Sequence, residues 1–123
     1  MNLVKEKWTK KDIAEFNKFL EQNKREDKID FQKRVCNTNM KNLGIMLPDC
    51  KNIAKQIHEG NFKDFLEKND YKYFESAIVS AFLINYIKDV DEKKKYIDNL
   101  YMDTWSTVDT LTFKDKGLEK EYI

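Results

Sequence analysis

The feature that most constrains this 123-residue chain is an apolar stretch near its middle. Residues 71–88 read YKYFESAIVSAFLINYIK, and apolar side chains cover nearly every side of a helix drawn through residues 77–87. A helix that is apolar all round must be buried all round. A membrane-spanning helix needs about 20 apolar residues, and no stretch of the chain approaches that length. We therefore expect a buried central helix with other elements packed around it, and no association with a membrane.

Composition narrows the fold class further. The chain has only 3 glycines and 1 proline, too few for a turn-rich β-sandwich or barrel. Its 8 phenylalanines, 6 tyrosines and 2 tryptophans are too many for a disordered chain. The two cysteines, Cys36 and Cys50, cannot form a disulfide framework, and the charged N-terminus lacks the apolar core of a signal peptide. These features favour a helical protein of the reducing cytoplasm.

Capping residues and apolar spacing mark the expected helices. Thr9 and Asp12 resemble a capping box that opens a helix over about 10–23, with Trp8 stapled onto Ile13. A second helix carries Phe31 and Val35 and fades near residues 37–42. The remaining helix starts are marked by Pro48, Asn61, Asp70 (for the central helix), Asp91, and Asp103 or Thr104, and Gly60 is expected to cap a helix end.

Short helices joined by short turns favour antiparallel helix pairs within one domain over residues 1–123. The chain shows no crisp repeat, but helix pairs around one buried member suit an all-α solenoid of degenerate repeats. The tail over residues 114–123 has few apolar anchors, so we expect it to be frayed or to begin a further element.

Charge and motifs give little support to most enzyme classes. The net charge is +1, but residues 1–60 hold 13 basic and 9 acidic side chains, a weak indication of a phosphate-facing surface alongside the simpler reading of solvated lysines. Phosphate-binding glycine loops and zinc motifs are absent. The single histidine, His58, fits a surface position near a helix end. We expect neither a metal nor another cofactor.

One pair of residues stands apart. Trp105 and Asp109 are four residues apart, so a helix places the indole and the carboxylate on one face. Asp109 lies beyond the capping positions and has no local backbone role. Two interpretations stay open at this point: Trp105 is a core residue beside a surface acid, or the two side chains form a functional pair.

Three further stretches occur in a fixed order: LGIMLPD and IAK at residues 43–49 and 53–55, YFE and FLINY at 73–75 and 82–86, and DTWSTVD at 103–109. With them, the segment from about Phe31 to Phe113 resembles the N-terminal half of the DNA alkylation repair enzymes, which are HEAT-like-repeat DNA glycosylases. The three stretches are similar to the family's GVRxPDLRxLAK element, its YEE…LVIGY helix and its DNWxxCD element, respectively. Departures include Met46 in place of a frequent arginine, Asn85 in place of a glycine, and Thr104 and Val108 beside the pair.

The resemblance implies a HEAT-like α-solenoid, here incomplete, that binds double-stranded DNA and excises purines alkylated at N3 or N7. Asp109 would stabilise the oxocarbenium-like transition state, and Trp105 would hold the nucleotide beside it. Lysines of residues 1–60 would face the phosphates. An alternative is a non-catalytic helical module that binds DNA or protein. Apolar surface uncovered at the C-terminal end would allow two chains to form a homodimer.

Overall fold

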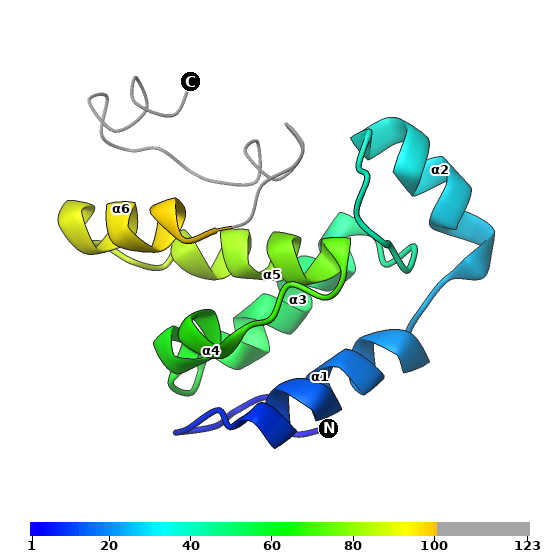
Figure 1. The fold of residues 1–123 in the computed structure, drawn as a ribbon. Coiled ribbons are helices and arrows are strands. Elements are labelled where there is room, and N and C mark those ends of the chain that lie inside the picture. Colours follow the sequence, from blue (N-terminus) through cyan, green and yellow to red (C-terminus); the bar gives the residue numbers. More distant parts are fainter. Residues whose placement is uncertain (101–123) are drawn as a thin grey trace.

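The structure is a computed structural model that describes residues 1–100, and it is helical throughout (Figure 1). Within these residues there is no β-strand, so the all-α prediction is confirmed. No helix in this part of the chain is long and apolar enough to cross a membrane. The helices are α1 (Lys10–Gln22), α2 (Glu26–Cys36), α3 (Leu47–His58), α4 (Phe62–Lys68), α5 (Phe74–Ile84) and α6 (Val90–Asp98).

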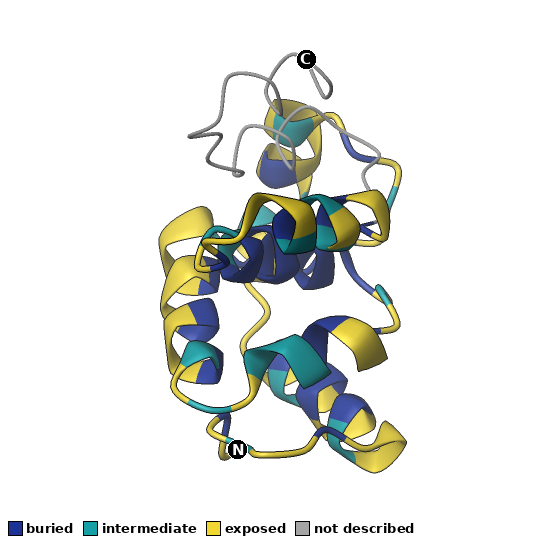
Figure 2. Ribbon diagram, turned by 90° about the vertical axis from the view of Figure 1, so that its left-hand side faces the viewer, coloured by how far each residue is buried: buried dark blue, intermediate teal, exposed yellow. Residues whose placement is uncertain are grey.

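Helix α5 is the buried centre of the fold, as its apolar sequence predicted. Every residue of α5 is buried except Phe82, which is half-buried. Helix α3 packs alongside α5 and runs in the same direction, while the short α4 returns the chain between them (Figure 1). In Figure 2 the buried residues gather in the middle of the molecule, with exposed residues along its outer helices. This arrangement is consistent with a helical-repeat solenoid.

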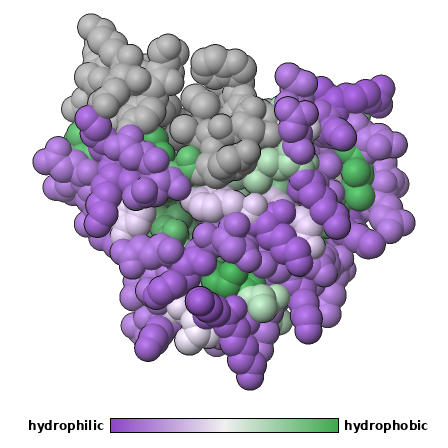
Figure 3. Space-filling view, viewed as in Figure 1, coloured by the Kyte–Doolittle hydropathy of each residue, from purple (hydrophilic) through white to green (hydrophobic). Residues whose placement is uncertain are grey.

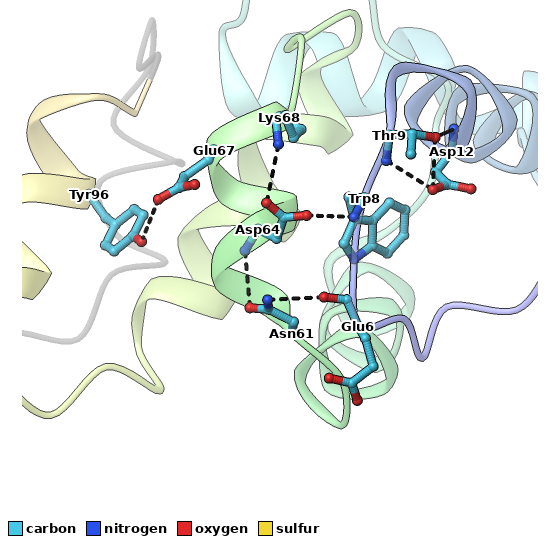
Figure 4. A network of polar contacts seen from close by, with 9 residues as sticks. All are labelled: Glu6, Trp8, Thr9, Asp12, Asn61, Asp64, Glu67, Lys68 and Tyr96. Carbon is cyan, nitrogen blue, oxygen red and sulfur yellow. Dashed lines mark hydrogen bonds and ion pairs between the residues drawn. The ribbon is translucent and has the colours of Figure 1, made fainter.

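The N-terminal segment is fastened to α4 by a buried tryptophan and a set of polar contacts (Figure 4). The Trp8 indole is fully buried and meets the rings of Phe16 and Phe65 edge-on, the latter at a centroid distance of 5.0 Å. The Trp8 backbone N–H donates to the Asp64 carboxylate, and the Asn61 side chain donates to the Glu6 carbonyl at 3.1 Å. Leu3 and Trp8, which precede α1, are therefore part of the folded core.

Two of the predicted caps are confirmed. The Thr9 hydroxyl accepts from the Asp12 backbone N–H at 3.1 Å, and the Asp12 carboxylate accepts from the Thr9 N–H at 2.9 Å, which completes the capping box of α1. The Asn61 side chain accepts from the Asp64 N–H at 3.3 Å and caps α4. Each side chain satisfies an amide that has no partner inside its helix.

Two other predicted caps are wrong. Asp70 does not cap α5, because Tyr71 adopts a left-handed conformation (φ 52°) and the helix begins only at Phe74. The Asp70 carboxylate instead accepts from the Asn17 side chain at 3.1 Å. Asp91 lies in the first turn of α6, and the cap is Asp89, which accepts from the Glu92 N–H at 2.8 Å. Where two nearby acids can both cap, the sequence does not separate them.

The side of α2 that packs against the rest of the protein carries a buried polar side chain, and two of its apolar side chains are exposed. Phe31 is 46% exposed and Val35 is 65% exposed, while Gln32 is the buried residue of the helix. Figure 3 shows a small hydrophobic patch over α2 bordered by hydrophilic residues. No residue of this helix is among the buried residues of the core cluster, and Cys36 at its end packs against the cluster as a partly buried side chain.

The tight turn before α3 depends on a glycine. Gly44 has a φ of +75°, and an added Cβ would collide with the backbone carbonyl of Arg25. The Arg25 N–H donates to the Leu43 carbonyl at 2.8 Å in the same place. Because glycine alone tolerates both the positive φ and this close approach, the start of α2 can lie directly against the loop that precedes α3.

Candidate DNA-repair site

The two residues predicted to form the site, Trp105 and Asp109, lie outside the described residues, as does the helix that was expected to carry them. The predicted tail over residues 114–123 lies outside them too. The structure describes the approach to this segment. Ile97 of α6 and Leu100 just after it are 1% and 6% exposed and belong to the core cluster. The last described residues are thus packed on the core.

The most unusual polar residue in the described part is Glu75, in the first turn of α5. Its side chain is fully buried, and its carboxylate accepts from the backbone N–H groups of Leu43 (3.0 and 3.1 Å) and Ile45 (3.1 Å). Glu75 lies in one of the stretches that resemble the family, but no role was predicted for it from the sequence. The signal that could have found it is a single acid inside an otherwise apolar helix.

A second buried side chain holds the same loop from the opposite element. Gln32 of α2 donates to the Ile45 carbonyl at 2.7 Å and accepts from the Gly44 N–H at 3.1 Å and from the Asn42 side chain at 2.8 Å. We call residues 42–45 the pinned loop, since its backbone is held between Glu75 and Gln32. Buried backbone groups need such partners, because an unpaired one costs about 1–3 kcal/mol.

Burial changes the acid–base behaviour of this region. Burial raises the pKa of the Glu75 carboxyl above its usual range, although the backbone N–H groups of Leu43 and Ile45 favour the charged form. Burial, together with the charge of Glu75, also raises the pKa of the Cys50 thiol. Cys50 is fully buried, and its thiol contacts the Ile45 carbonyl at 3.7 Å. Such a thiol is protonated and unreactive.

Exposed basic side chains on three helices are the candidate phosphate contacts. Lys51 and Lys55 are one turn apart on α3, so they share a face of that helix. Several exposed cations form no ion pair with another described residue, namely Lys10, Lys11, Lys18, Lys33, Arg34, Lys51 and Lys55. All of them fall within residues 1–60, where the sequence has its basic excess.

The single histidine and the aromatic residues at the start of α5 pack against other side chains of the fold. His58 is half-buried and stacks on Tyr86 with ring centroids 3.7 Å apart and planes 15° apart. Tyr73 and Phe74 are buried and belong to the core cluster. Among residues 1–100 no group of histidine, cysteine and acidic side chains is placed to hold a metal ion.

Comparison with known protein families gives one match. The family model for the DNA alkylation repair enzyme matches residues 16–117, which is most of the chain. The chain belongs to this family. The family assignment gives it a role in DNA repair and DNA as its substrate. Comparison with curated proteins and with solved structures finds no match.

The matched segment relates the described fold to the predicted pair. It contains α2 to α6, the pinned loop, and both Trp105 and Asp109. The segment that resembled the family by its motifs, about Phe31 to Phe113, lies inside the match. The family match also includes most of α1, which the motif comparison left out.

Proposed function

We propose that this member of the DNA alkylation repair family is a DNA glycosylase that excises purines alkylated at N3 or N7 from double-stranded DNA. The observation that carries the proposal is the family match over residues 16–117, which includes both Trp105 and Asp109. The proposed scaffold is a HEAT-like solenoid, and the proposed location is the cytoplasm. No cofactor is required by this chemistry.

The proposed reaction needs few catalytic groups from the protein. An N3- or N7-alkylated purine carries a positive charge, so the bonding pair of the glycosidic bond leaves with the base and neutralises it without a general acid. The deoxyribose gains oxocarbenium character as the bond breaks. A nearby carboxylate stabilises that charge and orients the water that adds to the sugar carbon. We assign this role to Asp109 and the positioning of the nucleotide to Trp105.

The experiment is release of N7-methylguanine and N3-methyladenine from methylated duplex DNA by wild type and by Asp109→Asn. The substitution keeps the shape of the side chain and removes its charge, so we expect release to fall by about 100-fold or more, the size of one electrostatic contact in a transition state. Asp91→Asn, an exposed acid of α6, is the matched control and should keep full activity. Melting temperatures of all three proteins confirm that they are folded.

The same assay separates the enzyme from the non-catalytic alternative. Equal release by wild type and Asp109→Asn would reject the role of Asp109. A folded wild type that binds duplex DNA and releases neither base would favour a binding module instead. Pairing of two chains through the C-terminal end also stays a prediction, and sedimentation of the free protein and its DNA complex tests it.

A further inference from the structure

A cavity of about 300 Å³ lies between the end of α1 and the outer face of α3. Its apolar lining comes from Phe19, Ile45 and Ile53. Its polar lining comes from Asp49, Asn52 and Gln56 of α3, together with Asn23 and Arg25 that follow α1. Ligand sites often combine apolar surface with a few convergent polar groups, at volumes from about 300 Å³ upward. The cavity therefore has the volume of the smallest ligand sites, and its lining has more polar residues than apolar ones.

The polar groups of α3 in this cavity are free to serve a ligand. The side chains of Asp49, Asn52 and Gln56 are exposed and form no hydrogen bond with another described residue. Their positions at intervals of three and four residues put all three on one face of α3. Arg25 contacts Asp27 at 3.3 Å, but both side chains are more than half exposed, so this pair is weak and can be exchanged.

The cavity is also built on fixed backbone. Ile45 belongs to the pinned loop, whose N–H groups are held by the buried Glu75. The Arg25 N–H is bonded to the Leu43 carbonyl at 2.8 Å, and the Asn23 side chain donates to the Phe19 carbonyl at 2.7 Å. A site with a preformed frame loses less conformational entropy when a ligand binds.

We propose that this cavity binds a guanine base. One edge of guanine has adjacent N–H donors, and a carboxylate such as that of Asp49 can accept hydrogen bonds from both. Another edge has the acceptors N7 and O6, to which a guanidinium such as that of Arg25 can donate. The carboxamides of Asn23, Asn52 and Gln56 can donate and accept at the remaining positions. The apolar surfaces of Phe19, Ile45 and Ile53 suit the flat faces of the ring. Adenine lacks the paired donors that Asp49 would recognise.

The test is titration of the full chain with guanosine, followed by calorimetry and by amide chemical shifts. We expect guanosine to bind with shifts at α3 and the pinned loop, and adenosine to bind at least about tenfold more weakly, as expected for loss of one paired contact. Asp49→Asn should weaken guanosine binding at least about tenfold, while Asp30→Asn, an exposed acid of α2, should leave it unchanged. Likewise Gln56→Ala should weaken it, and Gln22→Ala, an exposed amide of α1 outside the cavity, should not.

A further arm distinguishes a free nucleoside from a base within a strand. The protein is titrated with single-stranded oligothymidine that carries one central dG, against oligothymidine alone. Binding that requires both the dG and Asp49 assigns the cavity to a base in DNA, and Asp49-dependent binding of guanosine alone assigns it to the free nucleoside. Equal affinity for guanosine and adenosine, an unchanged affinity in Asp49→Asn, or no binding at millimolar guanosine overturns the proposal. None of these results depends on base release, so the proposal can fail while the glycosylase activity stands.

Discussion

Glu75 shows how one buried carboxyl group organises the start of two helices. Its carboxylate is fully buried and has backbone N–H groups of the pinned loop as its partners. Removing this acceptor leaves buried backbone N–H groups without a partner, which costs about 1–3 kcal/mol for each group. The residue therefore has far greater weight in the fold than a surface acid of the same type.

We expect Glu75→Ala to lower the free energy of unfolding by about 2–6 kcal/mol, because the N–H groups of Leu43 and Ile45 both lose their acceptor. Glu75→Gln keeps one acceptor oxygen and should cost about 1–3 kcal/mol. Urea denaturation of the three proteins measures both values. Asp30→Asn serves as the control for removal of an exposed charge and should change stability little. A Glu75→Ala protein as stable as wild type would contradict the proposed role of the carboxylate.

The same residue predicts a dependence of stability on pH. Because burial raises the pKa of Glu75 in the folded state above its unfolded value, the folded state holds the proton more tightly. The contribution of Glu75 to stability is therefore fully present below the unfolded pKa and is lost as pH rises through the folded pKa. Denaturation of wild type and Glu75→Gln from pH 4 to 7 should show the variant's deficit shrinking as pH rises. A deficit that grows over this range would show that the N–H groups lower the pKa more than burial raises it.

At the scale of elements, α2 differs from every helix around it. Its contacts with the pinned loop are hydrogen bonds from Gln32 and a bond from the Asn42 side chain to the Ile29 carbonyl at 2.9 Å. Phe31 and Val35 contribute little burial. A helix with few buried apolar residues opens locally at a lower free energy than the core does.

We expect the backbone amides of α2 to exchange with deuterium faster than those of α5, at conditions where the protein is fully folded. Hydrogen exchange followed by mass spectrometry measures this directly. Gln32→Ala should speed exchange in α2 further, because it removes contacts to the pinned loop, whereas Phe31→Ser should leave exchange in α5 unchanged. Equal protection of α2 and α5 in wild type would show that α2 is fixed by more than these bonds.

Helices α2 and α5 also show which parts of the fold can be predicted from the sequence and which cannot. Helix α5 was predictable, since a segment that is apolar on every side can only be buried. The orientation of α2 was not, because its partner is the backbone of a loop, and backbone groups leave no side-chain pattern to read. Glu75 had a readable signal, but its partners are 30 and 32 residues away. The Trp105–Asp109 pair came from resemblance and stays a prediction.

For the molecule as a whole, a net charge of +1 does not by itself attract DNA, so binding must come from the arrangement of charges. The unpaired cations of residues 1–60 supply that arrangement, whereas several basic residues elsewhere are paired, as in Lys63 with Glu92 and Lys68 with Asp64. An uneven distribution of this kind lets the helices that carry these cations meet phosphates although the net charge of the chain is near zero.

We expect affinity for duplex DNA to fall steeply with salt concentration, with a slope in a log–log plot that reports the number of phosphate contacts. Lys51→Ala and Lys55→Ala should each reduce that slope by about 1 if both side chains contact phosphates. Lys63→Ala is the control, because the Lys63 side chain is already paired with Glu92. Fluorescence anisotropy with a labelled duplex at several salt concentrations gives the slopes. A flat salt response in wild type would exclude this lysine surface as the contact.

The polar attachment of α2 has a thermodynamic consequence. The change in heat capacity of an opening reaction is positive for the apolar surface that it exposes and negative for the polar surface. When α2 separates from the pinned loop it uncovers amide and carbonyl groups rather than a hydrophobic face. Its opening should therefore have a small change in heat capacity. The free energy for opening α2 should therefore depend on temperature with little curvature. The free energy of unfolding the core should keep the strong curvature that is typical of a hydrophobic fold.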